Sequence, residues 1–126
     1  LHLSIRRQRQ MCIRDRMYAE AANELAAVPT QDALDALNAV RTNAGLEGKT
    51  LAELSTKTLF RQAVYKERRL ELALECDRWF DIVRTGQMAA IFPGIDAYRQ
   101  LYPVPQTEIE NVNDKAGWQN EGYALE

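Results

Sequence analysis

Residues that build metal centres and disulfides are scarce in this chain of 126 residues, which has one histidine and two cysteines. Zinc sites need histidine or several cysteines, so this scarcity argues against a zinc site. The chain also lacks an apolar run near the ~20 residues that a membrane-spanning helix requires. No stretch alternates polar and apolar residues as a half-buried strand does. We therefore expect a mostly helical fold that holds no metal ion and no cofactor.

The first 16 residues match the translation of a laboratory sequence. In one reading frame, a common transposase-based sequencing adapter encodes Arg6 to Asp15 in order, and its remaining bases begin the codon of Arg16. A natural basic arm that binds nucleic acid or anionic lipid is the alternative interpretation. The unbroken run of matching codons favours the adapter, so we predict that residues 1–16 are not native. The native N-terminus, with any signal peptide or lipid-attachment cysteine, is then expected upstream of residue 17.

Excluding residues 1–16 changes the net charge of the chain and the set of residues available for catalysis or metal binding. The remaining residues carry 11 basic and 17 acidic groups, so the formal net charge becomes −6 instead of −2. An acidic chain without a basic stripe is a poor candidate for nucleic acid, because neutralised phosphates supply most of that affinity. The only histidine, His2, is lost, and a single cysteine remains, Cys76, which we interpret as a small apolar filler.

The spacing of apolar residues predicts a pair of helices near the start of the native part. Tyr18–Ala27 is alanine-rich and is ended by Pro29, and Thr30 can cap a second helix over Gln31–Asn43. Gly45 can end that helix in the left-handed conformation. Such a pair resembles one tetratricopeptide-type repeat, and a single pair needs further helices packed on it.

A third, long helix is expected from about Thr56 to Cys76, with a core face that includes Phe60, Val64, Leu70 and Leu74. A short helix over Arg78–Thr85 should end at Gly86.

Acids and arginines crowd the stretch from Glu67 to Gly86. Glu67 and Glu71 lie in line with the apolar stripe, where unpaired charge would be costly. A metal site or an acid/base catalytic site is one interpretation. A metal site in a helical bundle normally also uses histidine ligands. Glycoside hydrolysis needs two carboxylates on either side of a sugar, and nothing in the sequence locates such a cleft. The other interpretation, which we favour, is a structural charge lattice in which both acids pair with Arg69, Arg78 or Arg84.

From Gln87 onward, proline and glycine predict a long and mostly irregular tail. Within it, Thr107–Glu110 has the pattern of a capping box. Trp118 and Tyr123 lie in a loop rich in glycine and asparagine and are our candidates for ligand-binding aromatics. Alternatively, these aromatics hold the tail against the body of the protein. Trp79 and Phe80 are expected to pack as core aromatics against the long helix, with stacking on a sugar as the alternative.

Five motifs in order resemble the C-terminal part of SusD/RagB-type proteins, and the resemblance covers residues 17–126. The motifs are Tyr18–Ala21, Ala36–Gly45, Glu67–Glu71 together with Asp77–Gly86, Leu101–Gln106 and Gln119–Tyr123. Two positions depart from the family pattern: Cys76 stands where glycine is usual, and Glu121 stands where proline is common.

The resemblance implies a tetratricopeptide-like helical fold and a function. Such proteins are outer-membrane lipoproteins that face the cell surface, sit on a SusC-type TonB-dependent transporter and capture glycans or other nutrients without catalysis. The resemblance transfers no ligand-binding residue to this chain. A tetratricopeptide adaptor that binds peptide is the alternative function, although the tail after Pro93 argues against it, and a hydrolase ranks third.

Overall fold

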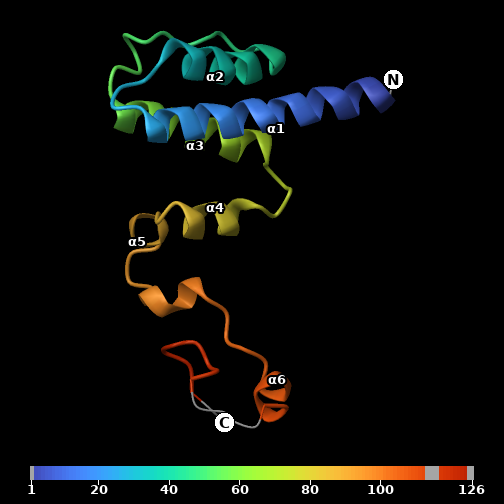
Figure 1. The fold of residues 1–126 in the computed structure, drawn as a ribbon, viewed down its shortest axis with the longest axis vertical. Helices are drawn as coiled ribbons and strands as arrows, with labels where there is room; N and C mark the ends of the chain where they lie inside the picture. Colours follow the sequence, from blue (N-terminus) through green and yellow to red (C-terminus); the bar gives the residue numbers. More distant parts are fainter. Residues whose placement is uncertain (1, 113–116, 125–126) are drawn as a thin grey trace. The chain divides into compact units, whose positions relative to one another are not determined.

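The computed structural model describes residues 2–112 and 117–124, with side chains described from residue 10 onward (Figure 1). The described residues form helices and turns and contain no strand, so the expected mostly helical fold is confirmed. The chain divides into two compact units, residues 1–75 and 76–126, which we describe separately. Among the described helices, none combines the length and the apolar character needed to cross a membrane.

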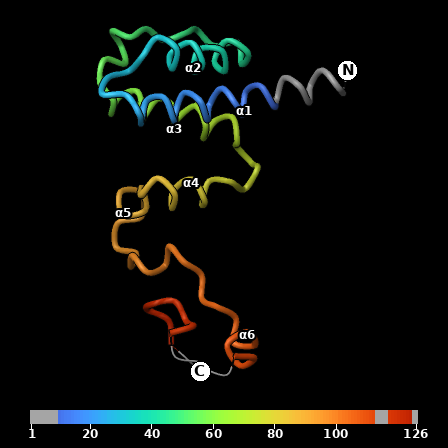
Figure 2. Tube along the Cα trace, viewed as in Figure 1, coloured from blue at the N-terminus to red at the C-terminus, as the bar shows by residue number. Residues whose placement is uncertain are grey.

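The first unit holds three helices, and the first of them contacts both others. α1 spans His2–Leu25, α2 spans Gln31–Asn43 and α3 spans Lys57–Glu71. Figures 1 and 2 show α1 running alongside α2 and α3. The buried core of this unit draws on all three helices and on the α2–α3 connection: Ala19, Ala33, Leu34, Leu37, Leu54, Phe60 and Val64.

Threonine caps begin α2 and α3. The hydroxyl of Thr30 accepts a hydrogen bond from the Ala33 amide at 3.3 Å, as predicted, and Thr56 does the same for the Leu59 amide at 3.2 Å. Each bond satisfies one of the amides that the first helical turn leaves without a partner. Gly45 adopts a φ of +74° and ends α2, which confirms the predicted stop.

The end of α3 differs from the sequence-based expectation. The helix stops at Glu71, not near Cys76, and Leu74 and Cys76 both have positive φ angles of 70° and 64°. A residue in the left-handed region cannot continue a right-handed helix. Leu74 lies beyond this end and is 101% exposed, so it is not a core residue as predicted. Leu70, inside α3, was also expected in the core but is 55% exposed.

The second unit consists of short helices joined by turns. α4 spans Arg78–Arg84, α5 spans Met88–Ile91, the 3₁₀ helix η1 spans Ala97–Gln100 and α6 spans Gln106–Glu110. Gly86 follows α4 with a φ of +66°, as predicted.

The predicted capping box at Thr107 was wrong. Pro105 stands at the N-cap of α6, so Thr107 already lies inside the helix, and no side chain caps it. The fixed φ of proline favours a helix start at this point.

Candidate functional site

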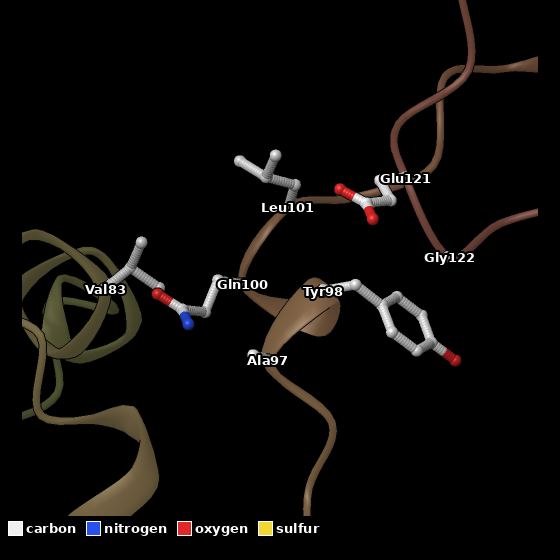
Figure 3. A pocket seen from close by; sticks show the side chains of 7 residues that line it. All are labelled: Val83, Ala97, Tyr98, Gln100, Leu101, Glu121 and Gly122. Carbon is white, nitrogen blue, oxygen red and sulfur yellow. The ribbon is translucent and has the colours of Figure 1, made fainter.

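A hollow of about 620 Å³ lies in the second unit, where α4, η1 and the closing tail segment meet (Figure 3). This volume is within the range of about 300–1,000 Å³ that is usual for small-molecule sites. The wall is formed by residues from three separate stretches of sequence: Val83 from α4, Ala97, Tyr98, Gln100 and Leu101 at η1, and Glu121 and Gly122 from the tail.

The wall of the hollow is mostly apolar and carries, besides the Tyr98 ring with its hydroxyl, two fully polar side chains. Val83, Ala97 and Leu101 supply aliphatic surface, whereas Gln100 and Glu121 supply an amide and a carboxylate. Figure 3 shows the Gln100 side chain beside Val83 and the Glu121 side chain extending toward Leu101. Neither polar group is hydrogen-bonded within the part of the chain that the structure describes. An apolar wall with a few unpaired polar groups is the usual composition of a ligand site.

Side chains of the tail hold the hollow together by bonding to the backbone that follows η1. Gln119 bonds both backbone groups of Val104, and the Asn120 amide donates to the Tyr102 carbonyl at 2.7 Å. The Tyr123 hydroxyl donates to the Leu101 carbonyl at 2.8 Å. These bonds fix the wall residue Leu101 against the tail that carries Glu121.

Close packing of Tyr98 and the tail forms one edge of the hollow. The ring of Tyr98 meets the ring of Tyr123 edge to face, with centroids 5.0 Å apart. Gly122 packs so closely on Tyr98 that an added Cβ would overlap its ring, and its φ of +91° also favours glycine.

The two aromatic candidates from the sequence lie near the hollow in the chain but do not line it. Tyr123 is half-buried, and its hydroxyl pins the tail to Leu101. Trp118 has an exposed fraction of 51%. A ligand-binding role for Trp118 and Tyr123 therefore stays a prediction. Sequence reasoning missed the seven wall residues, and the one available signal was Glu121, which departs from the family pattern.

A second aromatic group surrounds Trp79. Its ring lies 6.5 Å from that of Phe92 and 6.2 Å from that of Tyr102, measured between centroids. Trp79 is half-buried and Tyr102 is 69% exposed, so the group is open on one side. Phe80 is also exposed, at 67%. The expected packing of Trp79 and Phe80 against the long helix joins the two units and stays a prediction.

Three residues of the predicted lattice, Glu67, Glu71 and Arg84, have partners within their own units. The Glu67 carboxylate is buried and accepts from Arg41 at 2.7 Å, and Glu71 accepts from Arg16 at 2.9 Å. Arg84 lies 3.3 Å from Asp81 on α4.

Sequence reasoning missed Arg41 as the partner of Glu67, because the two residues lie on different helices. The predicted pairing of Glu67 and Glu71 with Arg78 and Arg84 joins the two units and stays a prediction.

Ionisable groups with shifted pKa values lie in the first unit. Hydrogen bonding to Arg61 lowers the pKa of Glu24, and Lys57 adds to the effect. Hydrogen bonds from Lys49 and then Thr50 lower the pKa of Glu53 to about 2. These are surface carboxylates held by cations and backbone amides. Over the described residues, no group of three or more His, Cys, Asp and Glu side chains is placed to hold a metal ion.

Comparison with known proteins identifies the family. A family model described as "SusD family" matches residues 17–100. "SusD-like protein P2" of Formosa agariphila is 31% identical over 119 residues, which cover 83% of this chain and 23% of that protein. The chain thus spans about a quarter of the length of this curated relative. No solved structure matches the chain. The extent of the family match shows that this chain belongs to the SusD family.

Proposed function

We propose that this chain is part of a cell-surface protein that binds glycans or other nutrients and delivers them to a SusC-type TonB-dependent transporter. The protein would face outward on the outer membrane, to which a lipid anchor attaches it. The observation that carries this proposal is the family match over residues 17–100.

A binding role is favoured over catalysis by the positions of the carboxylates. Glu67 is 2% exposed and engaged by Arg41, so it is not open to a substrate. The hollow offers one carboxylate, Glu121, among its seven wall residues. Hydrolysis of a glycoside needs two carboxyl groups that flank the bond. The wall instead combines an aliphatic surface with the hydrogen-bonding side chains of Tyr98, Gln100 and Glu121, which suits a ligand that is bound without reaction.

Calorimetric titration of the full chain with a panel of oligosaccharides and unrelated peptides tests this proposal. We expect an oligosaccharide to bind, to remain unchanged by mass after incubation, and to bind at least about tenfold more weakly when the hollow is filled. The filling variant is Ala97→Trp, and its matched control is Ala90→Trp, an exposed alanine on α5 outside the hollow.

Peptide binding without saccharide binding would favour the tetratricopeptide adaptor instead. Cleaved saccharide products would favour the hydrolase function. Co-purification of the protein with a TonB-dependent transporter from outer membranes tests the partner separately.

A further inference from the structure

We propose that Glu121 sets the charge preference of the hollow, so that the site takes saccharides without negative charge and discriminates against acidic ones. This inference rests on the proposed binding function and adds the class of ligand to it. It is carried by the position of one carboxylate, the absence of a compensating cation in the wall, and the aliphatic surface opposite.

Glu121 is the one charged residue among the seven wall residues. Its carboxylate only accepts hydrogen bonds. The neighbouring Gly122 packs on Tyr98 and holds this part of the tail beside η1.

No cation in the wall offsets this charge. The seven wall residues include neither lysine, arginine nor histidine. Arg99 is the neighbouring cation on η1, and its guanidinium lies 5.4 Å from the centre of the Tyr98 ring and 4.0 Å from the Asp96 carboxylate. Arg99 is not one of the seven wall residues. Glu121 is exposed, so its repulsion of an anion acts through solvent and is strongest at low ionic strength.

The remaining wall groups fit the other parts of a sugar ring. Val83, Ala97 and Leu101 offer aliphatic contact to its carbon–hydrogen face. Glu121 can accept hydrogen bonds from adjacent hydroxyls, and the Gln100 amide can both donate and accept. A uronate would instead bring its own carboxylate toward Glu121, and the wall side chains that could donate to it are the Gln100 amide and the Tyr98 hydroxyl, neither of which carries a positive charge.

Matched ligand pairs provide the test on the full chain. Each pair joins a neutral oligosaccharide (gluco-, galacto- or manno-configured) with its uronate, in which the C6 hydroxymethyl group is oxidised to carboxylate. At low ionic strength, we expect the neutral member of the tightest-binding pair to bind at least about fivefold more strongly than its uronate. This ratio should shrink as salt is added, because ions screen the repulsion.

The Glu121→Gln variant removes the charge and keeps the size of the side chain. We expect it to lower the neutral-to-uronate ratio to about twofold or less by strengthening uronate binding. Glu108→Gln on α6 is the matched control, since it removes the same charge from an exposed residue outside the hollow, and it should leave the ratio unchanged.

Three outcomes would overturn the proposal. If the wild-type chain binds the two members of a pair equally, the charge preference fails while the binding function stands. If Glu108→Gln changes the ratio as much as Glu121→Gln does, the effect belongs to net charge and not to the hollow. If no saccharide binds, the proposed function itself fails, and the charge preference fails with it.

Discussion

The side chain of Gln119 bonds both backbone groups of Val104. Its Oε1 accepts from the Val104 amide at 2.8 Å, and its Nε2 donates to the Val104 carbonyl at 3.2 Å. Oε1 also accepts from the amide of Asn120 at 3.0 Å. One side-chain amide thereby does what a neighbouring strand does in a sheet, where each residue of a pair exchanges two backbone bonds. The tail is held in place by side chains and not by a backbone ladder.

Replacing Gln119 with alanine should release the tail from the segment that follows η1. The part-buried amide and carbonyl of Val104 would lose their partners, at a cost of about 1–2 kcal/mol of unfolding free energy. Amide hydrogen exchange at Val104 is the measurement, and its protection should fall. Gln119→Glu is the matched variant, because it can still accept from the amide but cannot donate to the carbonyl. Unchanged exchange in both variants would contradict this role of Gln119.

Gly122 should tolerate no side chain, for two separable reasons. Its positive φ penalises any Cβ, and a Cβ there would also overlap the Tyr98 ring. Gly94 has nearly the same φ, +92°, but no atom lies within 4 Å of its added Cβ. Gly94→Ala should therefore cost only the backbone term of about 1–2 kcal/mol, and Gly122→Ala should cost at least about 1 kcal/mol more. Urea denaturation measures both, and equal losses would show that the Tyr98 contact contributes nothing.

Local features of the fold were predictable because they depend on a few neighbouring residues. The cap at Thr30 and the stops at Gly45 and Gly86 follow from side-chain oxygens and from the conformational freedom of glycine. The end of α3 was not predictable in this way. Leu74 and Cys76 take left-handed conformations that neither residue prefers, so their own propensities contain no stop signal.

The hollow escaped prediction for a different reason. Its wall joins α4, η1 and the tail, which are far apart in the sequence and include irregular chain without periodicity. A pattern argument detects faces of helices and strands, but here there is no repeating face to detect. Glu121 was noted only as a departure from the family, and the wall that gives it a role became visible in three dimensions.

Arg41 should be essential to the stability of the first unit. Its guanidinium bonds the buried Glu67 carboxylate at 2.7 Å, and Arg41 itself is 19% exposed at the side chain. Arg41→Met would leave a charge buried without a partner, so we expect a loss of about 3 kcal/mol in the free energy of unfolding. The double variant Arg41→Met with Glu67→Met should recover most of that loss, because two apolar side chains can replace a buried ion pair. A double variant as unstable as the single one would contradict this account.

Arg16 provides a test of whether residues 1–16 belong to the native protein. It resembles Arg41 in pairing with a glutamate of α3, Glu71, but that carboxylate is 29% exposed, and the buried Nε of Arg16 makes no hydrogen bond to the described residues. The Arg16 side chain is only 3% exposed, but water can reach Glu71 when Arg16 is removed, so Arg16→Met should cost less unfolding free energy than Arg41→Met. A loss as large as that of Arg41→Met would indicate that the first 16 residues are an integral part of the fold.

Glu53 should titrate far below an ordinary glutamate. Its carboxylate accepts from Lys49 Nζ at 2.7 Å and from the amide and hydroxyl of Thr50 at 2.9 and 3.0 Å, which lowers its pKa from 4.5 to about 2. A pKa that folding lowers contributes stability that is fully present above the unfolded value and is lost as pH falls through the folded one. The connection between α2 and α3 should therefore loosen between about pH 4.5 and 2.

Residue-specific NMR titration of the Glu53 carboxyl carbon checks this expectation, with a midpoint near 2. The Thr50 amide shift should follow the same curve and become insensitive to pH over this range in Glu53→Gln, because that side chain does not ionise. A midpoint near 4.5 would show that the bonds to Lys49 and Thr50 do not persist in solution.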